Sequence, residues 1–565
     1  MIRIVGLFLA ASLFGQNILP LREVRAGMRG VGRTVFAGDR VEEFQVDILG
    51  VLENAGPKQS IILGRLSGGP LAGSGVMQGM SGSPVYVDGK LLGAVALAFA
   101  FSKEPIAGIR PIEEMLRSDP PRRASGRSLD ELAKNRPEYA AGGARMLEIA
   151  TPLSFGGFTR GAIEQFTPQL RALGLEPMQG AGGGGRANRG GSPAPLQPGS
   201  MISVQLVNGD LSVGADGTVT HIDGNRVFAF GHRFLSMGPT EMPFARAEVL
   251  ALLPNLSTSF KISAAREWVG AITADYSAAI AGRIGQRAAM VPVSINVKGR
   301  DLYKMDIVED RLLTPFLLQM ATYSAIDGTE RTTGSSTVDV KGRIRFAAGA
   351  PVSIDNTYAA ETNVALLASL AASIPLSYAM QSGFGEFKPK GIDLDIDVQD
   401  DRRLLRVEQL WTSRTRVRPG ESFDVHLLLG GPGGVEMRRK VEYRVPVGAS
   451  AGNLQITAAD AMTTNIAEYA SILTQPPDTA GRVVEILNGL RGNSAATLRI
   501  NRVEPGFVVH GRHLPDPPPS LALLLRNDPG AATPAATSKL AQFDFPIDGW
   551  VVSGARTTYV QVLDE

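Results

Sequence analysis

The sequence predicts a mainly β protein with some α structure, divided into roughly two to four domains. The chain has 565 residues, more than one hydrophobic core normally serves. Its 65 glycines and 36 prolines punctuate many short runs rich in valine, threonine and isoleucine, a pattern typical of strands joined by turns. Apolar residues make up 44% of the chain and charged residues 20%, which indicates a folded globular protein rather than a disordered one.

Charge and cysteine content exclude several classes of function. The formal net charge is +2, so the chain lacks the strongly basic balance of a nucleic-acid-binding protein. It has no cysteine, which excludes disulfides, cysteine nucleophiles and thiolate metal sites. Because no histidine pair has metal-ligand spacing and no loop has the spacing of a calcium site, we expect no metal and no other cofactor.

Residues 1–16 are predicted to be a signal peptide. A short basic start ending at Arg3 precedes the uncharged apolar run 4–14, which is too short to span a bilayer well. Small and polar residues follow, and we expect cleavage near Gly15 and export to the periplasm, the cell envelope or the medium. A buried N-terminal strand or helix is the alternative.

Residues 17–178 begin as a series of short strands separated by turns. The predicted strands are Val31–Phe36, Phe44–Leu52, Ser60–Leu66, Ser83–Val87 and Leu91–Phe99. Asp88 and Gly89 join the last two as a tight hairpin turn. A short helix is expected from Pro111, because proline suits a first turn. Residues 179–200 follow as a glycine-rich flexible linker.

Residues 201–300 are again rich in strands. A hairpin with its turn at Asp223-Gly224-Asn225 brings His232 to the end of an apolar strand. Residues 301–400 are predicted to be an α+β region, with helices at Arg311–Ile326 and Thr362–Ser382. The second helix is uncharged, but its proline and polar residues favour a buried helix over a membrane span.

Residues 401–565 are predicted to form a β-sandwich-like C-terminal region. The expected strands are Leu404–Thr412, Phe423–Leu429, Val435–Val445, Thr497–Ile500 and Thr557–Val562, with a helix at Thr479–Leu490. Strand-rich regions bind other chains by strand addition. A protein partner that binds through this region is therefore one hypothesis.

The segment Gly79-Met80-Ser81-Gly82-Ser83-Pro84 is the strongest chemical motif of the chain. Small neighbours leave the Ser81 hydroxyl room to act as a nucleophile, and the amides of Gly79 and Ser81 can converge on one point as an oxyanion hole. The alternative is a glycine-rich β-turn whose serines only bond to backbone.

A serine nucleophile needs a general base, and histidine is the usual one. The histidines of the chain are His221, His232, His426, His510 and His513. His232 is the best candidate, because it follows Gly231 at a strand end, whereas His221 precedes a hairpin turn and is expected to be structural. Sequence spacing does not decide this, since such partners meet in space and not in chain order.

Two separate segments resemble one known family. Residues 78–84, with 88–95, resemble the nucleophile segment of the SpoIVB-type serine peptidases, which are sporulation signalling proteases of the chymotrypsin-like clan. Residues 217–232 resemble the histidine segment of that family; residues 41–48 and 270–285 resemble flanking stretches. The resemblance implies a chymotrypsin-like double β-barrel with Ser81 as nucleophile, His232 as base, and Gly79 and Ser81 as oxyanion donors.

The chain departs from the family pattern in the order of its segments and in its acid. The serine half (17–178) precedes the histidine half (201–300), as in a circular permutation, which is physically tolerable if both halves pack into the same cleft. The family's acid position falls near Leu66, where no carboxylate is found. Asp275 is the candidate third member of the triad, with Glu241 and Asp47 as alternatives. A PDZ-like segment, which the sporulation peptidase carries, is not recognised.

Two hypotheses for function follow. The first is an exported serine endopeptidase that acts on protein or peptide substrates, with self-processing in the linkers 118–145 or 179–200 as a further reading that borrows from both. The second is a non-catalytic exported binding or assembly protein on a peptidase-like fold, motivated by the missing acid and the long C-terminal β-region.

Overall fold

The structure of the protein is a computed structural model. This structure describes residues 18–99, 102–117, 128–134, 136–141, 144–180, 195–256, 258–300, 302–328, 336–474, 477–509, 512–515, 517–527 and 532–564. The predicted signal peptide, most of the glycine-rich linker and His510 lie outside these residues.

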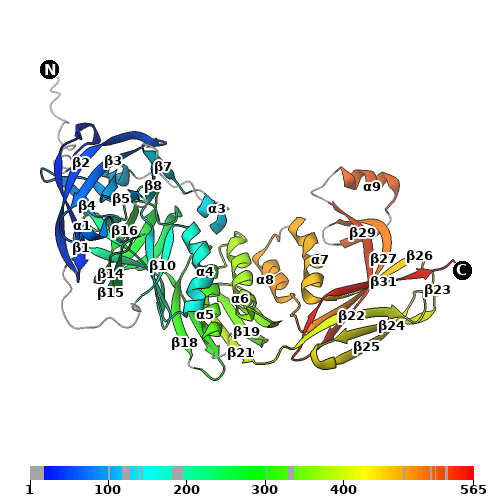
Figure 1. Cartoon of the computed structure of the whole chain (residues 1–565). Helices are drawn as coiled ribbons and strands as arrows, with labels where there is room; N and C mark the ends of the chain where they lie inside the picture. The colour runs from blue at the N-terminus through cyan, green and yellow to red at the C-terminus, as the bar shows by residue number, and fades with distance from the viewer. Residues whose placement is uncertain are drawn as a thin grey trace, which may run out of the picture. The chain divides into compact units, whose positions relative to one another are not determined.

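The chain is mainly β, as the sequence predicts, and forms two compact units (Figure 1). The first unit comprises residues 1–293 with 303–324, and the second comprises 294–302 with 325–565. Both halves of the predicted peptidase region therefore lie in the first unit, apart from residues 294–300. The finer boundaries proposed from the sequence stay predictions.

The first sheet of the first unit closes on itself. Its strands pair in the order β4-β1-β2-β3-β6-β5, and β5 pairs again with β4, so that six antiparallel strands form a closed ring. The strands of this first ring are β1 (Arg29–Ala37), β2 (Arg40–Gly56), β3 (Gln59–Ser67), β4 (Pro84–Val87), β5 (Lys90–Phe99) and β6 (Ile106–Pro111). The same part of the chain also contains the helices α1 (Leu71–Ser74), α2 (Ile112–Leu116) and α3 (Leu129–Lys134) and the strands β7 (Glu138–Ala141) and β8 (Ala144–Glu148).

A second ring of six antiparallel strands forms within the next sheet. The pairing runs β12-β13-β16-β15-β14-β11 and returns from β11 to β12. Its strands are β11 (Met201–Gly209), β12 (Ser212–Asp223), β13 (Arg226–Ala229), β14 (Gly238–Leu253), β15 (Phe260–Asp275) and β16 (Ile280–Ile284). This second ring is flanked by β9 (Thr151–Gly156), β10 (Leu175–Gln179), α4 (Arg160–Ala172) and β18 (Tyr303–Val308). Along the chain, the ring is followed by β17 (Met290–Val297) and α5 (Leu313–Asp327).

The first ring is filled by one apolar core, and the candidate nucleophile segment is anchored in it. Phe44, Ile62 and Val95 belong to this core, together with Met77 and Met80. Burying two methionines that flank Gly79 excludes water from beneath the segment and fixes its position.

The second unit begins with a layer of strands and one long helix. β19 (Ser336–Phe346) pairs with β20 (Val352–Ala360) on one side and with β21 (Pro389–Gln399) on the other, and α6 (Val364–Gln381) contacts β19 and β20. Within the described residues α6 is the one helix long and apolar enough to cross a membrane, and 56% of it is buried inside the protein. That burial favours the expected packed helix.

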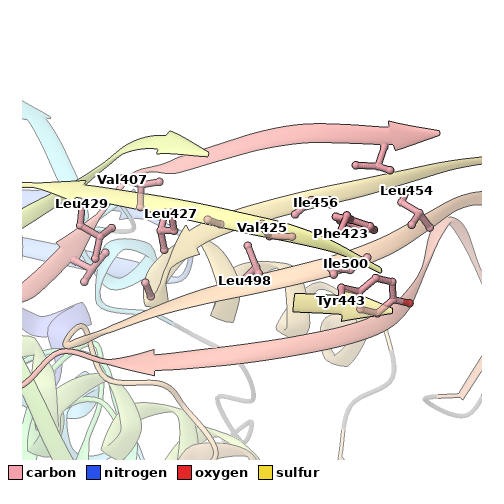
Figure 2. Packing of buried hydrophobic residues seen from close by; sticks show 14 of the residues in the cluster. Val407, Phe423, Val425, Leu427, Leu429, Tyr443, Leu454, Ile456, Leu498 and Ile500 are labelled. Carbon is pink, nitrogen blue, oxygen red and sulfur yellow. The ribbon is translucent and has the colours of Figure 1, made fainter. Parts of the chain in front are cut away.

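The rest of the second unit consists of two sheets around a shared core. Side chains of β22, β24, β26 and β27 converge in this core, among them Phe423, Ile456 and Leu498 (Figure 2). The strands are β22 (Leu404–Thr412), β23 (Arg416–Val417), β24 (Ser422–Gly430), β25 (Glu436–Arg444), β26 (Gly452–Asp460), β27 (Ala495–Val509), β28 (Arg512–Pro515), β29 (Ala532–Pro546), β30 (Val551–Ser553) and β31 (Ala555–Val562), with helices α7 (Ala461–Thr474), α8 (Ala480–Asn488) and α9 (Pro519–Arg526).

Candidate functional site

The nucleophile segment is a tight loop between α1 and β4, and its glycines are required by the backbone. Gly79 has φ +87° and Gly82 has φ +91°, both in the left-handed region. At Gly82 a Cβ atom would also lie 2.0 Å from the Thr218 carbonyl oxygen and 2.5 Å from the Phe230 amide nitrogen. The loop is therefore in direct contact with residues of the predicted histidine half.

Hydrogen bonds from β12 hold this loop in place. The Thr218 amide donates to the Ser81 carbonyl at 2.9 Å, and the Thr218 hydroxyl donates to the Gly79 carbonyl at 2.9 Å. The Thr220 hydroxyl donates to the Gly82 carbonyl at 2.7 Å. Because residues two apart on a strand face the same side, β12 clamps the loop with one face. The structure thus brings together the two segments that the sequence singled out.

His232 lies just beyond the end of β13, on a distorted piece of backbone. Phe230 and Gly231 are both left-handed, with φ +72° and +70°, which is strained for a phenylalanine. A Cβ atom on Gly231 would lie 3.1 Å from the Val95 carbonyl oxygen, which also accepts a 2.8 Å hydrogen bond from the Gly82 amide. One carbonyl of β5 therefore adjoins both the serine loop and the histidine segment.

The tautomer of His232 leaves its Nε2 atom able to accept a proton. Its Nδ1 lies 2.6 Å from the Arg233 carbonyl oxygen, and since a carbonyl can only accept, Nδ1 carries the proton and Nε2 the lone pair. The side chain is 2% exposed, and burial lowers the pKa of His232 to about 4, with nearby arginines acting in the same direction and the carbonyl opposing. The imidazole is therefore neutral at pH 7.

Ser81 is fully buried, and its hydroxyl oxygen has no hydrogen-bond partner; the same is true of His232 Nε2. The two atoms are therefore not hydrogen-bonded to each other in this state. Buried polar atoms without partners are costly and uncommon in folded proteins. Two of them on neighbouring segments mark this place as a candidate active site.

The amides predicted to form the oxyanion hole are free to do so. The amides of Met80, Gly82 and Ser83 donate to the carbonyls of Met77, Val95 and Met80 at 3.1, 2.8 and 2.9 Å. For the amides of Gly79 and Ser81, by contrast, no acceptor is found within the described part of the chain. These two are the donors that an oxyanion between them requires.

Asp275 lies near His232 but contacts its loop rather than its ring. Its carboxylate accepts hydrogen bonds from the amides of Phe234 (2.8 Å), Leu235 (2.7 Å) and Met237 (3.1 Å), and burial raises its pKa against the effect of these amides. The geometry differs from the predicted triad, because His232 Nδ1 donates to a backbone carbonyl instead.

The two alternative acids have other surroundings. Glu241 is exposed on β14. Asp47 is half-buried on β2 and forms an ion pair with Arg29 at 3.7 Å. Neither forms a hydrogen bond or an ion pair with His232.

Sequence reasoning missed two charged residues of the site. Glu148, at the end of β8, accepts a 3.4 Å hydrogen bond from Arg233, the neighbour of His232. Lys261, at the start of β15, is fully buried, and its ammonium donates to the Thr34 hydroxyl at 2.8 Å. Ser83 donates to the same Thr34 oxygen at 3.0 Å.

Lys261 forms part of the floor of the nucleophile loop. A Cβ atom on Gly79 would lie 3.2 Å from Lys261 Cδ, and the Lys261 amide donates to the Gln78 carbonyl at 3.2 Å. Burial lowers the pKa of Lys261 to about 7. The one sequence signal was a lysine alternating with apolar residues in Phe260-Lys261-Ile262, which does not by itself mark a site.

Two of the other histidines, His221 and His426, have contacts that indicate structural roles. The ring of His221 stacks on Phe228 with centroids 6.3 Å apart, and that of His426 stacks on Trp411 at 5.1 Å. The backbone of His513 lies in β28. Among the residues that the structure describes, no group of three acidic or histidine side chains is placed to hold a metal ion.

A comparison with models of known protein families places part of this chain in a peptidase family. Residues 17–116 match the family described as SpoIVB peptidase S55. This segment contains all six strands of the first ring and the Ser81 loop. No curated protein and no solved structure matches the chain.

Proposed function

Because residues 17–116 carry the SpoIVB-type serine peptidase signature, we propose that this protein is a serine endopeptidase with Ser81 as nucleophile and His232 as general base. The observation that carries the proposal is the pair of buried atoms without partners, Ser81 Oγ and His232 Nε2, on segments clamped together by Thr218 and Thr220.

The two strand rings support a chymotrypsin-like double barrel in permuted order. Each ring has six antiparallel strands, β1–β6 in the first and β11–β16 in the second. Ser81 precedes β4 of the first ring and His232 follows β13 of the second, so the proposed active site lies where the two rings meet. We propose that this arrangement is the family's active site with its serine and histidine barrels exchanged in chain order.

The proposed reaction follows from the named atoms. Ser81 Oγ attacks a peptide carbonyl carbon while His232 Nε2 takes the hydroxyl proton, and the carbonyl oxygen becomes an oxyanion held by the amides of Gly79 and Ser81. His232 then gives its proton to the leaving amine, which leaves an acyl-Ser81 ester. Water, deprotonated by His232, cleaves that ester and restores Ser81.

A backbone carbonyl takes the place of the acid in this scheme. The bond from His232 Nδ1 to the Arg233 carbonyl fixes the tautomer and orients the ring, as a triad aspartate does. It offers a dipole instead of a full negative charge, so it stabilises the imidazolium less. We therefore expect a slower enzyme than one with a complete triad.

Access to the proposed site requires movement. Ser81 is fully buried and His232 is 2% exposed, so a peptide reaches them only when the residues above them are displaced. This closed state also favours the second candidate function, a non-catalytic binding or assembly protein on the same fold. In that case Ser81→Ala leaves the cellular function intact, whereas removal of residues 401–565 abolishes it.

The test of peptidase activity uses the purified full-length chain and a mixed peptide library analysed by mass spectrometry. We expect internal cleavage by the wild type and none by Ser81→Ala. Ser83→Ala is the matched control, because it alters a neighbouring buried serine of the same loop and is expected to keep cleavage. A library left intact by the folded wild type would contradict the proposal.

We also propose that the protein is exported and that it cuts itself in the linkers 118–145 or 179–200. Residues 1–16 carry the basic start and short apolar run of a signal peptide. N-terminal sequencing of the protein from cells is expected to find a start near Asn17. Linker fragments are expected from the wild type and not from Ser81→Ala.

A further inference from the structure

A cavity of about 220 Å³ opens beside the nucleophile loop. It is lined by residues 74–76 and 78, which lead into that loop, by the end of β5, by Glu148 and Ile149, and by residues 255–256 and 258–259. Pockets for drug-sized ligands span roughly 300 to 1,000 Å³. The smaller volume here suits a single amino-acid side chain.

The cavity and the nucleophile share their supports. Gln78, in the cavity wall, stands three residues before Ser81 and is fixed by a 2.9 Å hydrogen bond from its amide to the Ser259 carbonyl. On β5, Val95 accepts from Gly82 of the loop, while Ala98 lines the cavity. A peptide attacked by Ser81 would therefore have a side chain next to the scissile bond within reach of this cavity.

The chemistry of the wall favours a cationic side chain. Gln78 Oε1 and Glu148 Oε1 are buried acceptors without partners, and their residues are only 5% and 6% exposed. Glu104 adds a second carboxylate, which is already paired with Arg65 at 2.8 Å, and the lining residues that the structure describes include no lysine, arginine or histidine. Val76 and Ile149 supply apolar walls for an aliphatic stem.

We propose that this cavity binds a lysine or arginine side chain of the substrate beside the scissile bond, with Gln78 and Glu148 accepting hydrogen bonds from its charged head. The inference rests on the peptidase function proposed above. Lysine and arginine combine an apolar stem with three or more donors and no acceptor, which matches the two unpaired acceptors Gln78 Oε1 and Glu148 Oε1, whose residues belong to the cavity wall.

The surroundings of Glu148 limit how selective the cavity is. Arg233 already pairs with Glu148 Oε2, and Arg110 and Arg136 also lower the pKa of Glu148, which burial raises. These guanidiniums help keep the carboxylate ionised, but they also repel an incoming cation. We therefore expect a preference of about 10- to 100-fold in kcat/KM for lysine or arginine over norleucine.

The first test compares peptides that differ only at that residue, cut by the full-length protein. The wild type is expected to prefer lysine and arginine over norleucine, and Glu148→Gln is expected to lose most of this preference. Glu176→Gln, which removes a carboxylate paired with Arg171 elsewhere in the first unit, is the control and should keep it. Equal kcat/KM for all three peptides in the wild type would overturn the proposal.

The second test is independent of catalysis. Binding of n-butylguanidinium to the Ser81→Ala protein is measured by calorimetry, with 1-pentanol as the neutral control. We expect binding of the cation alone, its loss in Glu148→Gln, and weakening as the pH falls. The pH effect follows because burial raises the pKa of Glu148, so its carboxylate is protonated at a higher pH than an ordinary glutamate, although Arg233, Arg110 and Arg136 face it.

The two tests separate the possible failures. Cleavage without a preference, together with no cation binding, would overturn the cavity proposal and leave the peptidase intact. Cation binding by a protein that cuts no peptide and is not modified at Ser81 would overturn the substrate role of the cavity along with the peptidase function. The pH dependence in Ser81→Ala keeps the proposal testable if Glu148→Gln does not fold.

Discussion

The serine segment and the histidine segment hold their key side chains in different ways. The backbone turn of the Ser81 loop comes from its own residues, the left-handed glycines Gly79 and Gly82 and the buried Met80, and β12 then binds the turn once it is formed. The His232 segment is shaped from a distance, because the carboxylate of Asp275 holds three amides of its loop and Glu148 binds its neighbour Arg233. The serine segment can therefore be recognised from a short sequence motif, whereas the contacts of the histidine segment can be recognised only in the folded structure.

The largest expected effect joins the two segments. If Ser81 and His232 act as one unit, Ser81→Ala and His232→Ala each lower kcat/KM by at least about 10³-fold, and the double variant is no worse than either single variant. Peptide hydrolysis by the three variants measures this. Losses that multiply in the double variant would mean that the residues act separately.

The buried lysine beneath the serine loop gives the next effect, on stability. The pKa of Lys261 is about 7 in the folded protein and near 10.5 when exposed, so between these pH values the unfolded chain binds more protons. The free energy of unfolding therefore gains up to about 5 kcal/mol as the pH rises from 7 to 10.5.

In Lys261→Met this rise should disappear, and urea titrations across that pH range measure it. Lys90→Met is the control, because Lys90 is exposed on β5. A pH dependence as steep in Lys261→Met as in the wild type would contradict the burial of an ionisable amine at this place.

The left-handed glycine at the contact between the segments gives a smaller effect. Gly82→Ala places a Cβ atom 2.0 Å from the Thr218 carbonyl and is expected to cost at least about 3 kcal/mol of unfolding free energy. Gly89 also has a positive φ, +76°, but nothing lies within 4 Å of its Cβ position, so Gly89→Ala should cost only about 1 kcal/mol. Equal costs in thermal or urea unfolding would refute the close approach.

The smallest effect concerns the hydroxyl of Thr220, which binds the Ser81 loop from β12. Thr220→Val removes the hydrogen bond to the Gly82 carbonyl and should cost about 1 to 2 kcal/mol, since the buried carbonyl loses its donor. Thr220→Ser keeps the hydroxyl and should recover most of that loss. If Ser and Val destabilise the protein equally, packing rather than the hydrogen bond holds the loop.

Features fixed by neighbouring residues could be predicted from the sequence. The Asp88-Gly89 hairpin and the strands on either side of it follow from turn chemistry, and both turn residues have positive φ. α4 was missed, because Gly161 and Pro168 argue locally against a helix. Its stability comes from burial, for example from Phe166 packing edge-on against Phe316 at 5.8 Å.

The candidate site likewise contains residues that the sequence could identify and contacts that it could not. Ser81 and His232 could be named from their segments, and the structure places those segments in contact. The contacts of Asp275, Glu148 and Lys261 could not be foreseen, because each depends on a strand register that brings residues more than 30 positions apart together. The role of a charged residue in an apolar strand, such as Lys261, depends on which residues of other strands it contacts in the fold.

The most direct test of the central claim is the mass of the protein after reaction with a fluorophosphonate, followed by peptide mapping of the adduct. We expect one adduct on Ser81 of the folded full-length chain, absent from Ser81→Ala and strongly slowed in His232→Ala. A folded wild type that stays unmodified, or that is modified equally with and without His232, would contradict it.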